Sequence, residues 1–373
     1  MNNQQRATTA SSGQGLVYKP DWEETKQRYS AWWRGEKLDR CLLAVCAPRD
    51  EAPPDEYPDT PPTIEQRWMD LAYLDARNEY EWRHTFYGAE AVPQWCPGYP
   101  GHVSMPTFYG CPIELDWDTG WHGAILTGEK LDVSGLSINR TGRWWQFGLE
   151  VHRHARQAAA GKALPGLCAI MGGGDTLSSL RGAERLLMDL MDDPSGVREA
   201  EIKLMHDWFK VYRMYADLLR AGDDWFTTWF PVWTPGYYYT AQCDVSYGIS
   251  PKSFRECFLP AIQLQTDLLD YSLYHVDGIG AFPFVDDLCK LERLGGLQIL
   301  PGAGKPSPLH YLDVLRKVQR AGKRLHISIE PQEVPQALEL LSSRGLCIGT
   351  WCGSEKEALT VIEQASRLSV DRT

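Results

Sequence analysis

The chain of 373 residues lacks several patterns that would place it in a well-marked class. Its ten cysteines include no Cys-x-x-Cys pair, which in a chain of this length indicates reduced thiols, as in a cytoplasm, and not a disulfide framework. No apolar run reaches membrane-spanning length. There is no long basic run and the net charge is -11, which argues against a nucleic-acid or anionic-membrane partner. The sequence therefore predicts a cytoplasmic protein that acts on a small molecule.

The composition predicts one large folded domain after a short tail. Residues 1–15 are rich in Asn, Gln, Thr, Ser and Gly and lack the apolar core of a secretory signal, so we expect a disordered tail. The remainder, 16–373, contributes to a hydrophobic fraction of 43%, which is enough for a large core. It shows no linker that would separate two domains and no internal repeat.

Strand-like and helix-like segments alternate through the C-terminal half, which is typical of parallel strands joined by helical crossovers. The predicted strands there are 273–277, 297–300, 324–329 and 346–350, with helices at 284–294, 308–321 and 334–343 and after Ser354. Earlier strand candidates are 41–46, 89–93, 167–171 and 225–230. The total of eight predicts an α/β fold with a single (β/α)8 TIM barrel. Residues 95–141 are irregular, so we expect an insertion over the C-terminal mouth.

Polar side chains collect at the expected C-terminal ends of these strands, where the site of such a barrel lies. His275 and Asp277 occupy alternate positions of one strand and would project together. Gln298, Glu330 and Cys352 follow at the ends of the next strands. An imidazole beside a carboxylate can bind a metal or move a proton. The alternative is a buried His-Asp hydrogen bond that only fixes the loop.

Aromatic residues gather near one further carboxylate, Asp244, just past a predicted strand end. Such rings could hold a methylammonium group by cation–π contacts, or they could belong to a packed loop with a capping aspartate. His326 shares the face of Glu330 and would reach into the barrel or stay as a core histidine. The residues expected to line a substrate pocket are Trp229, Trp233, Tyr237, Tyr239, Gln298 and His326.

The order of several motifs resembles the uroporphyrinogen decarboxylase superfamily, which includes methyltransferases that act with corrinoid proteins. The similarity spans roughly residues 21–368 and implies a (β/α)8 barrel. The motifs are 28–40 (RYSAWWRGEKLDR), 180–184 (LRGAE) with 190–194 (LMDDP), 249–251 (ISP) and 349–352 (GTWC).

Two features decide which branch of that superfamily the chain is similar to. The decarboxylase proper carries an arginine-rich segment after the first strand, whereas residues 47–51 here read APRDE, so the resemblance argues against haem-pathway decarboxylation. The corrinoid-linked methyltransferases hold zinc with a His-x-Cys pair and a later Cys. His275 and Cys352 match two of these positions, and Asp277 stands at the first-cysteine position. The resemblance therefore implies a zinc site at His275, Asp277 and Cys352, with a metal-free acid–base site as the alternative.

Three functions remain open from the sequence. The first is methyl transfer between a corrinoid on a partner protein and a substrate thiol or hydroxyl activated by the metal. The second is a metal-free decarboxylase or lyase, with Asp277 or Asp244 stabilising a cationic intermediate and His275 as proton donor. The third is a non-catalytic barrel that binds a ligand in an aromatic cage.

Overall fold

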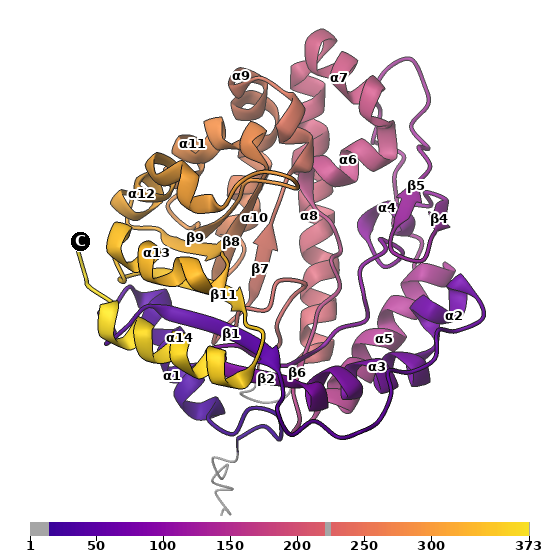
Figure 1. Ribbon diagram of the computed structural model, residues 1–373. Helices are drawn as coiled ribbons and strands as arrows, with labels where there is room; N and C mark the ends of the chain where they lie inside the picture. The colour runs from indigo at the N-terminus through magenta and orange to yellow at the C-terminus, as the bar shows by residue number, and fades with distance from the viewer. Residues whose placement is uncertain (1–14, 221–224, 373) are drawn as a thin grey trace, which may run out of the picture.

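A computed structural model describes residues 15–220 and 225–372 (Figure 1). The expected tail therefore lies almost wholly outside the described residues. The structure is a mixed α/β fold built on a seven-stranded sheet in the order β2-β1-β11-β10-β9-β8-β7. All neighbours run parallel except β2, which is antiparallel to β1. The strands are β1 (Leu42–Pro48), β2 (Thr85–Ala89), β7 (Tyr238–Ala241), β8 (Tyr271–Asp277), β9 (Gly296–Leu300), β10 (Arg324–Ser328) and β11 (Leu346–Trp351).

Four short strands lie outside this sheet. β3 (Gln94–Trp95) pairs in parallel with β6 (Leu164–Pro165), and a single parallel bridge joins Gly166 to Thr227. β4 (Ile113–Leu115) and β5 (Gly120–His122) form an antiparallel hairpin. Within the described ranges, the seven-stranded ladder ends at β2 and β7 and does not close on itself. The structure thus shows the α/β class with a parallel sheet, and not a hydrogen-bonded barrel of eight strands.

Three of the four early strand predictions need correction. The strand expected at 89–93 lies at Thr85–Ala89 and pairs antiparallel with β1, after a connection that contains two helices. Residues 167–171 form no strand; Met171 has φ +53°, in the left-handed region that no strand uses. Residues 225–230 contribute only the bridge at Thr227, since the chain bends at Trp229 and Phe230.

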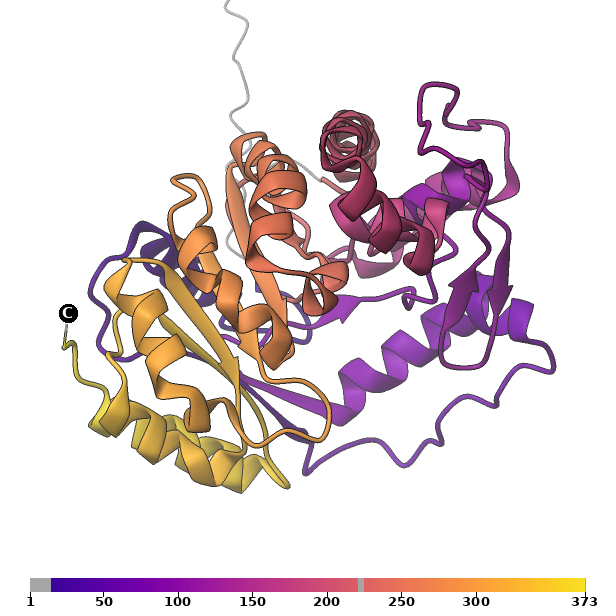
Figure 2. The same ribbon diagram turned by 90° about the horizontal axis from the view of Figure 1, so that it is seen from above.

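Helices cover one face of the sheet (Figures 1 and 2). This helix face is packed by α8 (Pro194–Leu219), α10 (Leu259–Asp267), α11 (Val285–Cys289), α12 (Leu312–Arg320), α13 (Val334–Leu340) and α14 (Glu355–Leu368). The others are α1 (Trp22–Arg34), α2 (Ile64–Met69), α3 (Leu71–His84), α4 (Met105–Phe108), α5 (Arg143–Ala159), α6 (Gly173–Arg181), α7 (Ala183–Asp192), α9 (Pro251–Ser253), η1 (Asp244–Gly248), η2 (Phe254–Phe258), η3 (Ile279–Phe284), η4 (Pro308–Tyr311) and η5 (Pro331–Glu333). In the part of the chain that the structure describes, no helix has the length and apolar character needed to cross a membrane.

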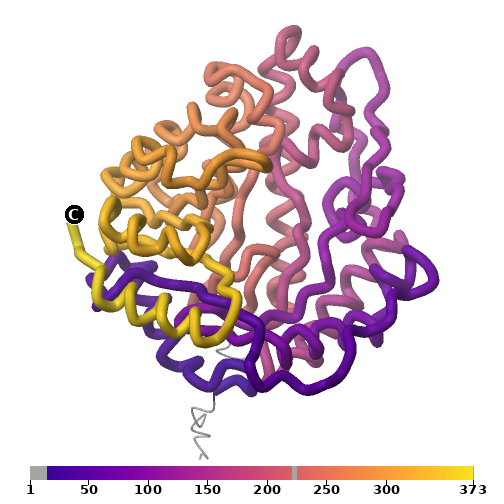
Figure 3. Tube along the Cα trace, in the orientation of Figure 1, coloured from indigo at the N-terminus to yellow at the C-terminus, as the bar shows by residue number. Residues whose placement is uncertain are grey.

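The expected insertion at 95–141 is irregular apart from α4 and the β4–β5 hairpin, as the tube trace shows (Figure 3). It is held against α6: Ile125 and Leu126 donate backbone N–H groups to Leu180. Arg181 in turn donates to the carbonyls of Leu126 and Gly128 at 2.8 and 2.6 Å. The insertion therefore packs against α6, the helix that begins within the glycine run 172–174.

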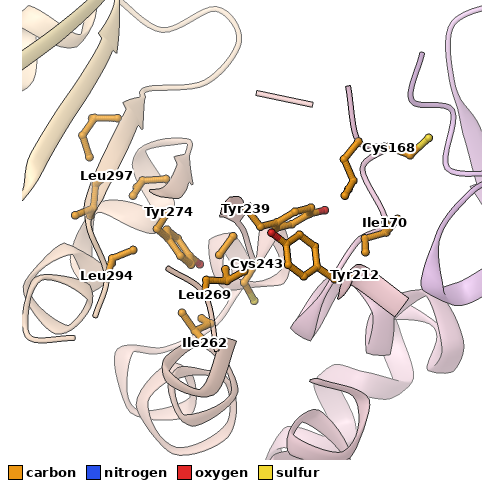
Figure 4. Packing of buried hydrophobic residues seen from close by; sticks show 14 of the residues in the cluster. Cys168, Ile170, Tyr212, Tyr239, Cys243, Ile262, Leu269, Tyr274, Leu294 and Leu297 are labelled. Carbon is orange, nitrogen blue, oxygen red and sulfur yellow. The ribbon is translucent and has the colours of Figure 1, made fainter. Parts of the chain in front are cut away.

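Alternation along the strands separates two buried clusters. On β8, Tyr274 and Val276 pack with the helices in an outer cluster, whereas Leu273 packs in an inner cluster with Trp233 and Cys347. Figure 4 shows Tyr274 among the outer residues. Because side chains alternate, His275 and Asp277 share the inner face with Leu273.

Helix α1 covers the N-terminal ends of the strands. Trp33 donates its indole N–H to the carbonyl of Trp233 at 3.0 Å, and the ring of Trp233 meets Trp22 edge-on at 5.6 Å. Arg324, at the start of β10, donates to the carbonyls of Trp32 and Trp33. Since this end is closed by α1, the polar groups at the C-terminal ends of the strands form the accessible side.

Candidate active site

His275 is held in one orientation by the neighbouring strand. The β8–β9 register sets His275 opposite Gln298, and His275 Nδ1 lies 2.6 Å from Gln298 Oε1. An amide oxygen only accepts, so Nδ1 carries the proton and donates it. In the neutral ring Nε2 is then left with its lone pair, 3.9 Å from Asp277 Oδ2. The arrangement presents a base next to a carboxylate that would stabilise its protonated form.

A second histidine lies on the next strand of the inner face. The register sets His326 of β10 opposite Gln298. His326 is buried, and Phe230 meets its ring edge-on at 4.7 Å. Burial, with a smaller effect of His275, lowers the pKa of His326 to about 3. His326 is therefore a neutral wall of the site.

Three further polar residues form a hydrogen-bonded group at the same end. Gln242 Nε2 donates to Asp175 Oδ2 at 3.0 Å and to Asp244 Oδ2 at 3.5 Å, and the backbone N–H of Asp244 donates to Asp175 Oδ1 at 2.7 Å. Burial, and then the charge of Asp244, raise the pKa of Asp175 to about 7. Asp175 can therefore exchange a proton near neutral pH.

Electrostatics connect the two groups into one site. Burial raises the pKa of Asp244, His275 opposes this effect, and Asp277 adds to it. Asp244 is exposed and lies on the wall of a cavity of about 360 Å³, so its carboxyl meets solvent. The cavity wall also includes Asp175, Gln242, Met171, Ser178 and Ser179.

The loop formed by Gly172 and the first residues of α6 can approach the site closely because it consists of glycines. A Cβ on Gly174 would lie 2.6 Å from the sulfur of Cys243, and Gly173 has φ +52°. This close approach brings Asp175 beside residues 242–244. From α8, Glu201 lies behind the loop, fully buried, with no hydrogen-bond partner among the described residues for either carboxyl oxygen. Burial and then Asp175 raise the pKa of Glu201 well above its ordinary value, so it is protonated there.

Sequence reasoning missed Gln242 and Glu201 as parts of this site. The sequence does carry a signal for Glu201, because this glutamate stands between Val197 and Leu204 on the apolar face of a long helix. A glutamate is unusual at such a buried position. Asp175 directly follows the glycines 172–174, and the sequence carries no signal that Asp244, 69 residues later, lies beside it.

Two residues expected at the site lie elsewhere. Cys352 follows the last residue of β11 and has the parity of Ile348, so its buried thiol belongs to the outer cluster and not to the inner face. Its backbone N–H donates to Cys46 at 2.7 Å. Glu330 is exposed at the start of η5, where its backbone N–H donates to Glu333 Oε2 at 3.1 Å. Within the described chain, neither makes a hydrogen bond or ion pair with His275.

The expected aromatic cage is not assembled. Of the grouped rings, Trp229 borders the site, where it meets His275 edge-on at 5.3 Å. Trp233 is packed at the opposite end against Trp22. Tyr237 lies on the outside, with its ring under the guanidinium of Arg213 at 3.6 Å. Tyr239 packs in the outer cluster near Tyr212, at 5.8 Å between ring centres (Figure 4). Trp233, Tyr237 and Tyr239 therefore lie in three different places, none of them beside His275.

The proposed zinc ligands do not fit the ion in this arrangement. Among the described residues, no three His, Cys, Asp or Glu side chains gather closely enough to hold a metal. His275 and Asp277 stand together, but the third ligand, Cys352, is on the other face of the sheet. Burial raises the pKa of the Cys352 thiol to about 11, whereas a zinc ligand must be the thiolate. The groups that meet at this site are therefore acid–base groups of the protein itself.

Comparisons with known proteins support the fold only. The structure is similar to that of a methyltransferase from Methanosarcina mazei, with a TM-score of 0.60 and 15% sequence identity, over 92% of this chain and 98% of the other. At that identity the likeness shows the fold alone. No protein-family model matches the chain, and no curated protein matches it.

Proposed function

We propose that this chain is a methyltransferase-like enzyme that works without a bound metal, with His275 as its general base. The observation that carries the proposal is the fixed imidazole: Nδ1 is tied to Gln298, and Nε2 faces the site beside Asp277. A small acceptor bearing an O–H, S–H or N–H group would lose its proton to Nε2 as it takes the methyl group. Asp277 would then stabilise the imidazolium.

The charge of the site supports a neutral or cationic substrate. Asp175, Asp244 and Asp277 meet at this end of the sheet, and the charged neighbours that shift the pKa of Asp244 are His275 and Asp277. Those of the three carboxyl groups that are ionised repel a carboxylate substrate and attract an ammonium group. The edge of Trp229 adjoins His275 and could contact an attached methyl group. The fold likeness to a methyltransferase supports the same reaction class.

The methyl donor belongs to the proposal as well. The sequence resemblance points to a methylated corrinoid carried by a partner protein. The methyl group would leave the corrinoid without its bonding electrons, form a bond to the acceptor atom, and leave the reduced corrinoid behind. The residues of this chain would orient the acceptor and remove its proton.

The test is methyl transfer from methylcobalamin to a panel of small thiols, alcohols and amines. The reaction is monitored by the loss of the methylcobalamin absorbance. His275→Ala should lower kcat by about 10²–10⁴-fold, the usual contribution of a general base. His206→Ala, on the exposed side of α8, is the matched control and should leave kcat unchanged. Full activity of His275→Ala would contradict the proposal, and binding of acceptors without any turnover would favour a non-catalytic ligand-binding protein.

A metal-free lyase is the second candidate, and one observation favours it. Asp175 lines the cavity of about 360 Å³, and burial and then the charge of Asp244 raise its pKa to about 7, which suits an acid that returns a proton to carbon after a carboxyl group has left. The same panel extended to small β-keto and amino acids separates the two candidates, because only a lyase releases carbon dioxide from them.

A further inference from the structure

A large basic pocket lies at the N-terminal ends of the strands, away from His275. Its volume is about 810 Å³, and it lies where β10 and β11 begin and where α1 ends at Gly35. Seven cationic side chains line it together with a single carboxylate, Glu339. These cations are Arg34, Arg316, Arg320, Lys323, Arg324, Arg344 and Arg372. Such a concentration of positive charge is unexpected in a chain of net charge -11.

Backbone carbonyls orient five of the seven cations, namely Arg316, Lys323, Arg324, Arg344 and Arg372, whereas Arg34 pairs with the carboxylate of Glu36 at 2.5 Å. Arg344 Nε donates to Gly35 at 2.8 Å, and Arg316 Nη2 donates to Leu340 at 3.2 Å. Arg372 Nη1 donates to Leu341 at 2.8 Å. In each case one or two nitrogens are used, and the remaining N–H groups of the guanidinium are left for another acceptor.

The positive charges act on one another. Arg324 donates to three carbonyls, and its pKa is lowered by burial and then by Arg344. Lys323 likewise has a pKa lowered by burial, with Arg324 adding to the effect. Helix C-termini near the pocket carry about half a negative charge each and offset this only in part. An anion in the pocket would therefore relieve repulsion as well as gain hydrogen bonds.

We propose that this pocket binds a compact small molecule that carries several phosphate groups. Guanidinium groups form paired hydrogen bonds to phosphate oxygens, and several arginines around one cavity suit a ligand with more than one phosphate. The volume is in the range of small-molecule sites. The described lining contains no aromatic ring on which a nucleobase could stack, which favours a compact phosphate ester or polyphosphate over a nucleotide. The inference does not depend on the proposed methyl transfer.

The experiment is calorimetric titration of the full chain with inorganic tripolyphosphate at a fixed ionic strength of about 0.15 M, where weak surface attraction is screened. The test variant is Arg320→Gln combined with Arg344→Gln, because both side chains are exposed and their replacement spares the core. Losing two charge-assisted contacts should weaken binding about tenfold or more. The charge-matched control is Arg153→Gln with Lys252→Gln, both exposed and outside the pocket, which should bind as the parent chain does.

The outcomes separate the proposal from its alternatives. A thermal melt of the double variant that matches the parent shows that any lost binding is not lost folding; if the double variant is unstable, Arg320→Glu alone replaces it. Equal affinity of the test and control variants would overturn the proposal. If the chain does not bind tripolyphosphate but binds a polyglutamate peptide, the proposal is also overturned. An acidic protein segment would then be the occupant of the pocket.

Discussion

His275 uses one ring nitrogen for a protein partner and leaves the other for chemistry. The 2.6 Å contact to Gln298 Oε1 selects the tautomer, because an amide oxygen cannot donate. Asp277 then faces the unprotonated Nε2 across 3.9 Å, a distance at which it can stabilise a proton that arrives there. Gln298 is accordingly a positioning residue that acts through His275.

The first prediction at this scale concerns Gln298→Leu. The variant removes the acceptor for Nδ1–H, so the ring should lose its tautomer preference and kcat should fall by about 10–100-fold, with KM little changed. The ¹⁵N shifts of His275 report the tautomer without any need for turnover. Gln298→Glu keeps an acceptor and should retain Nδ1–H, and Gln263→Leu on the exposed side of α10 is the control. Unchanged shifts in Gln298→Leu would refute the positioning role.

A second prediction follows from the pKa of Asp175, which burial raises from 3.8 to about 7. Between these values the folded state holds a proton that the unfolded chain has lost. The stability contributed by Asp175 is therefore full at low pH and is lost as the pH rises through about 7.

The side chain in Asp175→Asn stays neutral at every pH. The free energy of unfolding of this variant, relative to that of the parent chain, should therefore be higher at pH 8 than at pH 5. A gain of about 2–4 kcal/mol in the free energy of unfolding is expected. Urea unfolding at both pH values measures it, with Asp267→Asn, exposed on α10, as the control. A difference between variant and parent that is the same at both pH values would contradict the raised pKa.

At the scale of elements, regular signals in the sequence predicted the C-terminal half well. Gly322 (φ +71°) follows α12, and Ser354 accepts a hydrogen bond from the Glu357 N–H at 3.2 Å at the start of α14. The period of two along β8 correctly placed His275 and Asp277 on one face. The same period explains the error at Cys352, which lies one residue beyond Trp351 and so points to the opposite face.

The N-terminal half was less predictable because tertiary contacts decide its conformation. Residues 167–171 look like a buried strand, but the chain needs a left-handed turn at Met171 to bring Asp175 beside Asp244. The segment at 225–230 is apolar enough for a strand, yet Thr228 bonds its own neighbour Phe230 and the chain bends. Neither requirement leaves a local periodic signal.

The aromatic segment between Thr227 and β7 gives the prediction at this scale. Trp233 is buried between α1 and the strands, so Trp233→Ala should lower the free energy of unfolding by about 3–5 kcal/mol. Trp229 borders His275, so Trp229→Ala should weaken binding of trimethylammonium by about 0.5–2 kcal/mol and cost less stability. Urea unfolding and ligand titration of both variants measure the contrast. A stable Trp233→Ala that has lost ligand affinity would return this ring to the site.

At the scale of the whole molecule, charge is divided between the two ends of the sheet. The open end carries Asp175, Asp244 and Asp277, and the end covered by α1 carries the basic pocket with Arg324 and Arg344. Anions should thus be excluded from the reactive end and collected at the other. This polarity means that a phosphate ligand and a cationic substrate would not compete.

The same polarity predicts that the chain does not decarboxylate uroporphyrinogen. That substrate carries many carboxylates, and its binding needs several cations at the reactive end. Arg49, the arginine that follows β1, donates to the carbonyl of Thr85 at 3.1 Å, and two acids follow it in the sequence. Incubation should therefore yield no coproporphyrinogen above a protein-free control when products are separated by chromatography. Stepwise loss of the four acetate carboxyl groups would show that the three aspartates do not govern which substrates enter, and the acid–base site would have to be assigned to a carboxylated substrate instead.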